Sequence, residues 1–499
     1  MTTSEDSFQR IKPFVSNLER PVFAITGLPE EVIAVLFAYY SRSRDDLRTN
    51  LARLISDDTL GIASSQSPVS CHAQEKARAF HEKWVVGYGH ASVAEHAVVH
   101  LAVEQVSIIA SKVIEDLRLG SFTEKSTRYV VFDTGSFADL PSLPSPLAEP
   151  YRTACKNLFS TYLSLFPKVE AKLERLFPAE AQASRTHRQA ALRAHTCDLL
   201  RGLLPASTLT NLGITANARA LSNLLSKMLS SPLAEVRSVA EQMRQEALTV
   251  TPTLLRHVAP NPYRQSLQPT LTPLTAPSTQ IADSPVAVRI LRHDADALQR
   301  IVLALDYDQG AQPHAGRRWE MLQAKEVSAL ESMVKRALAH RGPHDPAPRA
   351  MESTSITVEL ELDYGAYRDL QRHRMLTPST QLLGCSLGYT PPEELSALAI
   401  GDDYARALDA VQIPWQRLAQ HDPFQAQYVV PLAYRTRVLW TLNLREVFHV
   451  VELRSARQGH TSYRRVAQAL YREICNIFPW LTELMRVDMQ EHSLARGTM

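Results

Sequence analysis

The stretch that decides the fold is ITVELELDYGAYRDLQRHR, residues 356–374. Apolar and polar residues alternate from Ile356 to Leu362, which is the period of a half-buried β-strand. Asp363 follows at a position typical of a helix N-cap, and residues 364–374 then have the composition of a short helix. The stretch therefore predicts a strand, a cap and a helix in direct succession.

The first half of the chain repeats this pattern. Residues 96–106, HAVVHLAVEQV, form a strand-like run, Ser107 stands at the cap position, and residues 108–118, IIASKVIEDLR, read as the helix. Each cap lies 11 residues before an arginine, which is Arg118 in the first half and Arg374 in the second. The equal spacing indicates one strand–cap–helix unit that is used twice.

A second shared unit follows in each half. The motif Asn-x-Arg occurs as NAR at 217–219 and as NLR at 443–445, and each copy opens a helical stretch. These stretches reach Arg237 and Arg464, which lie 20 and 21 residues after the respective asparagine. Because two units recur in the same order, we interpret the chain as a duplication.

The boundary between the halves is rich in proline. Residues 259–285 contain prolines at 260, 262, 269, 273, 277 and 285, which remove amide donors and interrupt helices and strands. We therefore predict an extended linker at 259–285 between a first domain at 1–258 and a second at 286–499.

Composition narrows the class of protein. The chain is 45% hydrophobic and 21% charged, as in ordinary globular proteins, and its net charge of +2 gives no general reason for nucleic-acid or membrane binding. Five scattered cysteines without a CxxC pair argue against a disulfide framework. No signal peptide or membrane helix is apparent. We expect a soluble cytoplasmic protein without nucleic-acid or membrane partners.

Two polar clusters could bind anions. Residues 118–129, RLGSFTEKSTRY, combine hydroxyl groups with Arg128, whose guanidinium can hold a phosphate in bidentate fashion, although a polar surface loop has the same composition. The cluster Arg372-His373-Arg374 could hold a flavin pyrophosphate, but basic residues at a helix C-terminus also complement the helix dipole. Both interpretations stay open for each cluster.

Other motifs exclude more than they indicate. Residues 89–96, GHASVAEH, contain two histidines and a glutamate, but their spacing is no established zinc pattern, so we predict no metal. The chain has no GxGxxG fingerprint, no GxxxxGK[ST] loop and no nucleophile elbow. A dinucleotide cofactor is therefore not expected to bind through a Rossmann turn.

Taken in order, the motifs resemble the flavin-dependent thymidylate synthase family, whose members carry GHxSxxEH, RHRxxSxxxxSxRY, NxR and a later helix with an essential arginine. The first half supplies GHASVAEH (89–96), DLRLGSFTEKSTRY (116–129), NAR and EVR (235–237). The second half supplies RHRMLTPSTQLLG (372–384), NLR and YRR (463–465). The resemblance implies an α+β fold made of two fused copies, each an antiparallel sheet packed with helices.

The two halves depart from the family pattern at different places. In the first half Asp116 and Leu117 replace the Arg-His of RHR, whereas Arg128 and the residues before it fit. In the second half RHR is intact, but Leu382 and Gly384 stand at the later Ser and Arg positions. The resemblance therefore implies one composite site that joins RHR of the second half to ExSxR of the first.

The resemblance also assigns roles to residues. Arg237 and Arg464 both match the catalytic arginine that polarises the pyrimidine, and Arg237 is favoured because it shares a half with the nucleotide loop. The residues implied to bind the nucleotide are Glu124, Ser126, Arg128, Arg372 and Arg437. The residues implied to bind the cofactors are Ser92, Glu95, Arg372, His373 and Arg374 for the flavin and His90 for the folate. On these roles Arg128→Ala is predicted to abolish nucleotide binding and to leave folding intact.

The implied reaction is the reductive methylation of dUMP to dTMP. Methylenetetrahydrofolate supplies the carbon, FAD carries the hydride, and NADPH reduces the flavin. Family members are homotetramers, so the resemblance implies a homodimer of this two-copy chain. Two alternatives remain: a non-catalytic flavin- or nucleotide-binding descendant of the family, and a helical scaffold that binds neither ligand.

Overall fold

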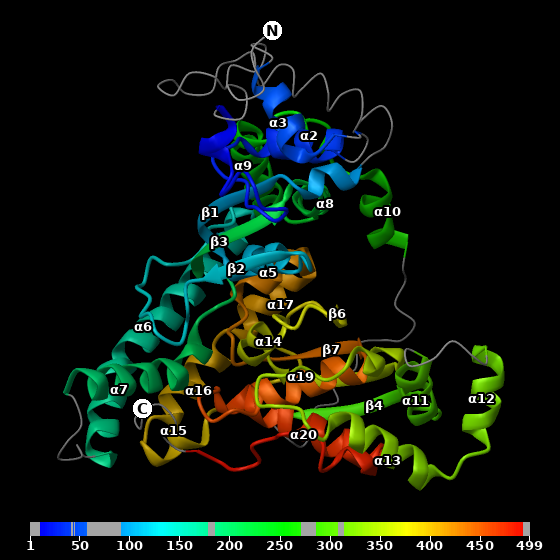
Figure 1. Ribbon diagram of the computed structural model, residues 1–499. Helices are drawn as coiled ribbons and strands as arrows, with labels where there is room; N and C mark the ends of the chain where they lie inside the picture. Colours follow the sequence, from blue (N-terminus) through cyan, green and yellow to red (C-terminus); the bar gives the residue numbers. More distant parts are fainter. Residues whose placement is uncertain are drawn as a thin grey trace. The chain divides into compact units, whose positions relative to one another are not determined.

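The computed structural model describes residues 10–56 (without 41, 42 and 44), 91–177, 185–270, 286–307 and 314–492. Its contacts divide the chain into two compact units (Figure 1). Unit 1 comprises Met1–Val106, Val113–Lys125 and Thr210–Leu274, and unit 2 comprises Ser107–Lys112, Ser126–Leu209 and Thr275–Met499. Much of the first half of the chain thus belongs to unit 2. The division into sequence domains 1–258 and 286–499 stays a prediction.

Unit 1 contains a three-stranded sheet in the order β1 (Val98–Ser107), β3 (Leu209–Asn217), β2 (Gly120–Glu124). Strands β2 and β3 are antiparallel, with Gly120 opposite Ala216 and Glu124 opposite Leu212. The other elements that lie wholly or partly in this unit are η1 (Lys12–Phe14), α2 (Glu30–Tyr40), α3 (Leu47–Ser56), η4 (Ala91–Glu95), α5 (Ile108–Glu115), α8 (Ala218–Leu229), α9 (Ala234–Val250) and α10 (Pro262–Thr270).

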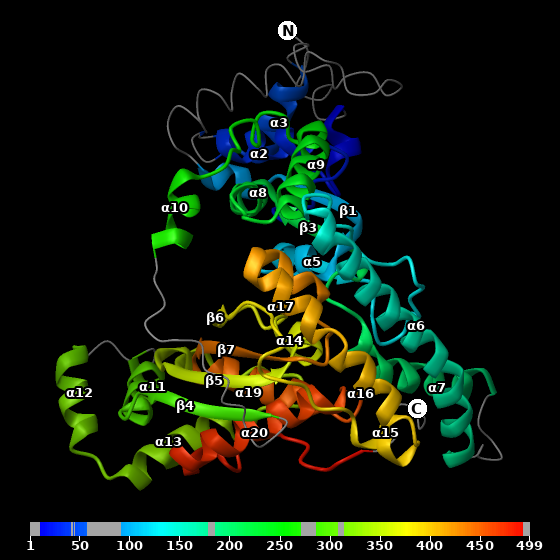
Figure 2. The same ribbon diagram turned by 180° about the vertical axis from the view of Figure 1, so that it is seen from behind.

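Unit 2 contains a four-stranded antiparallel sheet in the order β4 (Ala287–His293), β5 (Ile356–Asp363), β7 (Arg435–Leu442), β6 (Thr377–Thr380). The apolar positions of β5, Ile356, Val358, Leu360 and Leu362, are all 0% exposed, as the alternation predicted. Helix α20 (Thr461–Ile477) packs against β4 and β5 (Figure 2). The prediction of an α+β fold with antiparallel sheets and packed helices is confirmed.

Unit 2 contains many further helices. They are α6 (Ser145–Leu176), α7 (Arg185–Leu200), η5 (Arg201–Leu203), α11 (Ala297–Tyr307), α12 (Ala315–Gln323), α13 (Val327–Leu338), η6 (Arg349–Ser353), α14 (Tyr364–Leu370), α15 (Glu393–Ala397), α16 (Gly401–Asp409), α17 (Gln412–His421), α18 (Pro423–Ala426), η7 (Gln427–Val429), α19 (Leu444–Arg454) and η8 (Pro479–Leu481).

The predicted caps are present. Ser107 Oγ accepts a hydrogen bond from Ala110 N at 3.0 Å at the start of α5, and Asp363 Oδ1 accepts one from Ala366 N at 2.7 Å at the start of α14. Helix α14 ends at Leu370, however, so the prediction of a helix that continues to residue 374 is wrong. The basic cluster 372–374 lies in the turn beyond the helix.

The two units also share helix caps, an ion pair and a strand order. Asn217 caps α8 by accepting a bond from Ala220 N at 2.8 Å, and the second Asn-x-Arg motif caps α19 in the same way at 2.9 Å. Arg219 of the first motif pairs with Glu95 at 2.6 Å, and Arg445 of the second pairs with Glu352 at 2.5 Å. The strand order β1-β3-β2 of unit 1 also recurs as β5-β7-β6 in unit 2. The same motifs thus make the same local contacts in both units.

The proline-rich segment is partly helical. Residues 262–270 form α10, so the prediction of an extended segment from residue 259 onward is wrong there. Asn261 Oδ1 accepts a hydrogen bond from Tyr263 N at 2.9 Å, which allows a helix to start at Pro262. Residues 271–285 lie outside the described part of the chain.

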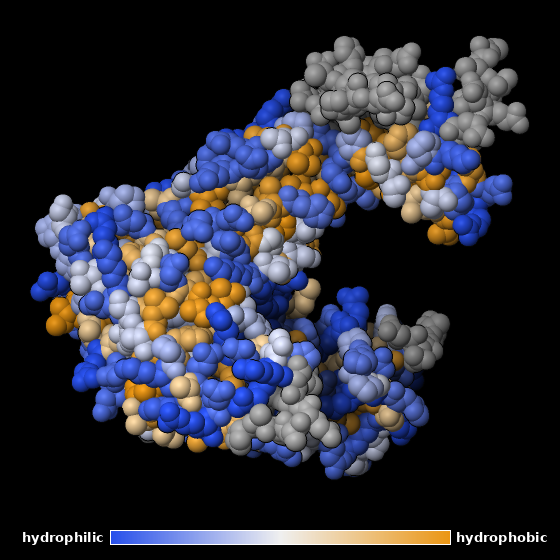
Figure 3. All heavy atoms as spheres, turned by 90° about the vertical axis from the view of Figure 1, so that its left-hand side faces the viewer, coloured by the Kyte–Doolittle hydropathy of each residue, from blue (hydrophilic) through white to orange (hydrophobic). Residues whose placement is uncertain are grey.

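The surface mixes residue types. On the face seen in Figure 3, hydrophilic residues alternate with small hydrophobic patches. Within the described ranges, no helix has the length and apolar character to cross a membrane.

Candidate functional site

Arg128 lies in unit 2, just after β2, and its guanidinium is fully engaged. Nε and Nη2 donate to the two carboxylate oxygens of Asp198 at 2.8 and 2.9 Å, and Nη1 donates to the hydroxyl of Tyr463 at 2.9 Å. Burial lowers the pKa of Arg128, but the bonds and charge of Asp198 outweigh it, so the pKa is raised. The hydroxyl of Ser126 accepts a hydrogen bond from Arg128 N at 3.2 Å. Arg128 is therefore a permanent cation held in a fixed orientation.

Arg128 belongs to a larger cluster of arginines and aspartates. Arg201 donates from Nη1 to Asp369 at 3.0 Å, and its side chain is 3% exposed. Arg368 reaches the hydroxyl of Thr127 at 3.5 Å. Burial raises the pKa of Asp369, but nearby cations, Arg201 foremost, outweigh it and lower the pKa. The cluster thus unites the first-half loop, the end of α7 with η5, and α14.

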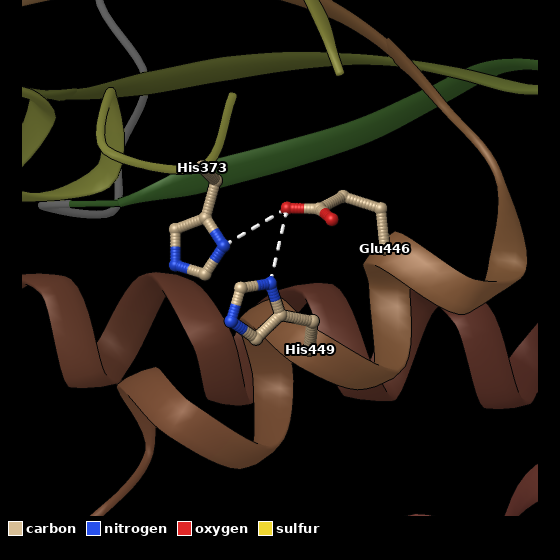
Figure 4. Close-up of side chains that lie close together, drawn as sticks. All are labelled: His373, Glu446 and His449. Carbon is tan, nitrogen blue, oxygen red and sulfur yellow. Dashed lines mark hydrogen bonds and ion pairs between the residues drawn. The ribbon is translucent and has the colours of Figure 1, made fainter. Parts of the chain in front are cut away.

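The histidine of the RHR motif points into the protein. His373 is 2% exposed, and its Nδ1 lies 3.0 Å from Glu446 Oε1 (Figure 4). Its Nε2 accepts a hydrogen bond from Arg454 Nε at 2.8 Å. Because Arg454 is always a donor, Nδ1 carries the imidazole proton and donates to Glu446. Burial lowers the pKa of His373, and the charges of Arg454 and His449 lower it further. The hydrogen bond and charge of Glu446 raise it but do not outweigh these effects, so the pKa is about 4. His373 is therefore neutral near pH 7.

His373, Glu446 and His449 form a group whose potential ligand atoms lie within 4.8 Å of one another. His449 Nδ1 is 3.5 Å from Glu446 Oε1 (Figure 4). Burial raises the pKa of Glu446, but its bonds with His373 and His449 outweigh this and lower it to about 2. A metal at His373 Nδ1 would move the proton to Nε2, where it would face the N–H of Arg454. This arrangement favours a hydrogen-bonded cluster, and the absence of a metal stays a prediction.

Tyr463 and Arg454 connect the two motif clusters inside unit 2. The guanidinium carbon of Arg128 lies 5.5 Å from the centre of the Tyr463 ring, and that of Arg454 lies 5.6 Å from it. Burial lowers the pKa of Arg454, and the charge of Arg372 adds to this effect. A chain of contacts therefore runs from Arg128 of the first half to His373 of the second.

A cavity of about 400 Å³ in unit 2 adjoins this cluster. Its lining includes Asp198, Asp363, Arg435, Arg465 and His460. His460 Nε2 lies 3.2 Å from the backbone oxygen of Asp198. Burial, and then the charge of Arg201, lowers the pKa of His460 to about 3. The polar lining and the adjacent arginines make this cavity the candidate ligand site.

The two candidates for the catalytic arginine differ in exposure. Arg464 in unit 2 is 2% exposed, and it donates to the backbone oxygens of Ser455 at 2.8 Å and Gln490 at 2.7 Å. Arg237 in unit 1 is exposed, and its Nη1 donates to the backbone oxygens of Ser231 and Pro232. Arg464 is thus buried and bonded to the protein's own backbone, whereas the side chain of Arg237 is accessible to solvent.

The other predicted residues are distributed over both units. In unit 1, Ser92 is exposed, Glu95 pairs with Arg219, and Glu124 ends β2. In unit 2, Arg437 pairs with Glu361 at 3.0 Å, and Arg372 and Arg374 are half-buried. His90 lies outside the described residues.

Of the two degenerate positions in the second half, Gly384 is closed by packing and Leu382 is exposed. A Cβ atom added to Gly384 would lie 2.7 Å from Cζ2 of Trp415, which belongs to α17. No side chain fits there without movement of the indole. Leu382 is 46% exposed. The position where the family has an arginine therefore holds a tryptophan ring from another helix.

Sequence reasoning assigned no role to several members of the site, above all Asp198, Arg201, Arg368, Asp369 and Tyr463. All of them lie on helices, and of these five only Tyr463 belongs to a short motif quoted for the resemblance, YRR (463–465), in which Arg464 alone received a role. One signal was available: Arg368 and Asp369 lie within the stretch 356–374 and only a few residues before the RHR motif that ends it.

Comparison with known proteins identifies the family. The family model "Thymidylate synthase complementing protein" matches residues 36–253 and 289–480. The chain belongs to this family. The resemblance inferred from the motifs is thereby confirmed, and the two matched segments lie on either side of the proline-rich segment.

Several relatives of the family are similar to this chain. A UPF0159 protein of Chlamydia muridarum is 33% identical over 99% of this chain and 97% of its own length. A flavin-dependent thymidylate synthase of Saccharolobus solfataricus is 28% identical over 36% of this chain and 62% of its own length. A crystal structure of a Helicobacter pylori flavin-dependent thymidylate synthase complexed with FAD and dUMP aligns with a TM-score of 0.30 and 16% identity, over 40% of this chain and 99% of that one.

His373 should make the stability of this family member depend on pH. Its pKa rises from about 4 in the folded chain to 6.5, the ordinary value, on unfolding. Between these values the unfolded chain binds the proton more tightly, so the free energy of unfolding falls as the pH is lowered, by at most about 1.4 kcal/mol per pH unit. His373→Gln should reduce this slope in urea unfolding between pH 7 and pH 5, while His460 still contributes in both proteins. Equal slopes would contradict the assignment.

Proposed function

We propose that the chain is a flavin-dependent thymidylate synthase that converts dUMP to dTMP with methylenetetrahydrofolate and NADPH. The observation that carries the proposal is the contact chain in unit 2 from Arg128 through Tyr463 and Arg454 to His373. The ExSxR end of one half and the RHR motif of the other thereby share one cluster. Each motif is degenerate in the opposite half, so this pairing unites the intact copies.

The charge of the cluster supports a phosphate-bearing substrate. The buried Nη2 of Arg201 has no hydrogen-bond partner in the described part of the chain. A buried guanidinium N–H without an acceptor is costly, and an oxygen of a phosphate group would satisfy it. The excess of arginines in the cluster would attract the same group. We propose that Arg128, Ser126 and Arg372 orient the nucleotide, with Glu124 and Arg437 as further ligands.

The RHR motif fits an anionic cofactor. His373 is fixed by Glu446 and Arg454, so the backbone between its two neighbours, Arg372 and Arg374, is held in place. We propose that these arginines bind the pyrophosphate of FAD, with Ser92 and Glu95 as further contacts and His90 near the folate. Bound FAD would supply the hydride; the protein supplies orientation and charge.

The repeated strand order, caps and Glu–Arg pairs support the proposal that the chain consists of two fused copies of the family fold. Trp415 fills the space beside Gly384, where family members have an arginine. This packing supports the proposal that only one composite site is functional, the one that joins RHR of the second half to ExSxR of the first. We further propose a homodimer, in which the chain replaces two subunits of the family's homotetramer.

A second function is favoured by one observation. Asp198 occupies the bidentate edge of Arg128, which is compatible with a non-catalytic descendant whose nucleotide site is permanently filled. The two proposals differ in turnover. An active synthase should purify with flavin absorbance and oxidise NADPH only when dUMP and methylenetetrahydrofolate are present. Flavin binding without NADPH oxidation would favour the non-catalytic descendant over the active synthase.

The two catalytic candidates can be separated by substitution. We expect Arg464→Met to lower the melting temperature, because it leaves the backbone oxygens of Ser455 and Gln490 without their donor. We expect Arg237→Met to leave the melting temperature unchanged and to reduce kcat by about tenfold or more through loss of one charge-assisted contact in the transition state. Thermal unfolding and steady-state kinetics check both variants. A stable but inactive Arg464→Met would reverse the assignment.

A further inference from the structure

Asp198 lies where an anionic ligand of Arg128 would bind. Its two carboxylate oxygens accept from Nε and Nη2 at 2.8 and 2.9 Å, and the two side chains are 14% and 11% exposed. Carboxylate and phosphate groups present two oxygens to a guanidinium in the same bidentate manner. Asp198 therefore uses the same edge of Arg128 that a phosphate would use.

Asp198 also has space to leave this position. It lines the cavity of about 400 Å³ described above, at its boundary with the arginine cluster. Rotation of its side chain into the cavity would open the Nε–Nη2 edge of Arg128. Tyr463 would keep its bond to Nη1, so the guanidinium would hold its orientation after Asp198 moves.

The charges favour exchange of one anion for another. Arg128, Arg201 and Arg368 are the cations of this cluster. The carboxyl groups beside them are those of Asp198, Asp369 and Asp363, and burial raises the pKa of Asp363. With Asp198 turned away, three guanidinium groups face two carboxyl groups. A phosphate monoester carries a charge of about −1.5 to −2 near pH 7, whereas Asp198 carries a single charge. A dianion therefore gains more from this cluster than the carboxylate that it replaces.

We propose that Asp198 is an internal competitor that holds Arg128 when the site is empty and is displaced by the phosphate group of the nucleotide. This inference rests on the proposed function, in which Arg128 binds that phosphate. Displacement of Asp198 costs every anion the same free energy, so it weakens the binding of all anions by the same factor. Asp198 thus sets the affinity of the site, and a phosphate monoester displaces it because its higher charge gains more from the arginines.

Calorimetry on the full chain tests the proposal with three probes: dUMP, its singly charged methyl phosphodiester, and inorganic phosphate. Asp198→Asn removes the charge and keeps an oxygen that accepts from Arg128. We expect it to bind dUMP about tenfold more tightly or better, since one charge-assisted bond pair no longer competes. The diester should gain by about the same factor as dUMP, because both ligands displace the same competitor.

Asp139→Asn is the matched control. Asp139 makes the same bidentate pair with Arg152, at 3.0 and 2.9 Å, but it is 55% exposed. We expect wild-type affinities for all three probes in this control. If Asp198→Asn lowers the melting temperature strongly, Asp198→Ser serves as the second charge-free variant and should show the same order of affinities.

The outcomes separate the inference from the proposed function. If the wild type binds dUMP and both Asp198 variants bind it equally or more weakly, Asp198 orients Arg128 and the competitor role is wrong, while the proposed function stands. If the Asp198 variants bind inorganic phosphate more tightly but no protein binds dUMP, the competitor role stands and the nucleotide substrate is wrong. If no variant binds any probe, both are wrong.

Discussion

Arg128→Ala is expected to lower the affinity for dUMP by about a hundredfold or more. Loss of a bidentate guanidinium–phosphate contact removes two charge-assisted hydrogen bonds, each worth about 1.5–3 kcal/mol. Arg201 and Arg368 do not offer the same bidentate edge, because Nη1 of Arg201 donates to Asp369 and Nη1 of Arg368 donates to Thr127. Calorimetric titration with dUMP measures the effect.

The same substitution should also destabilise the fold, contrary to the prediction from sequence that folding stays intact. Asp198 is 14% exposed, and Arg128 supplies two of its hydrogen bonds. A largely buried carboxylate that loses its partner costs about 3–5 kcal/mol when fully buried, and solvent access reduces this cost here. We therefore expect a lower melting temperature for Arg128→Ala.

A double variant separates the two effects. Arg128→Ala combined with Asp198→Asn also removes the carboxylate charge that Arg128 compensated, so it should recover most of the lost stability and none of the lost affinity. Arg152→Ala, on the exposed pair with Asp139, controls for loss of an arginine and should change neither property much. Wild-type affinity in a folded Arg128→Ala protein would remove this residue from the site.

The strand–cap–helix units could be predicted because their signals are local. Alternation in residues 356–362 fixes which face of β5 is buried, and the Ser107 and Asp363 side chains bond to amides three residues away. The end of α14 was predicted too late because it depends on a distant contact. His373 turns inward to Glu446, 73 residues later in the chain, and no local pattern contains that information.

The candidate site could be predicted only where a motif supplied it. Arg128 and His373 belong to motifs, but Asp198 and Arg201 lie at the end of a helix with no recognisable pattern. Arg237 and Arg464 match the same family arginine, but their surroundings in the structure differ. Arg464 is held by the backbone oxygen of Gln490 in the C-terminal segment, whereas Arg237 is exposed. Burial of an arginine depends on which segments pack over it, and the motif does not encode this.

Gly384→Arg, which restores the family's arginine in the second half, is expected to destabilise the chain by about 1–3 kcal/mol or more. The Cβ alone would lie 2.7 Å from Cζ2 and 3.3 Å from Cε2 of Trp415, closer than van der Waals contact allows. The indole must therefore move or the backbone must shift. Urea unfolding of the variant and the wild type measures the loss.

Trimming the tryptophan should relieve the clash. In Trp415→Ala the loss of the half-buried indole is itself destabilising, because its removal takes away apolar contacts. Adding Gly384→Arg to this variant should cost much less than adding it to the wild type, and the difference between the two costs is the coupling of the two residues. Strict additivity would mean that Trp415 does not fill the position. Coupling would show that Trp415 of α17 occupies the space that a side chain at residue 384 needs.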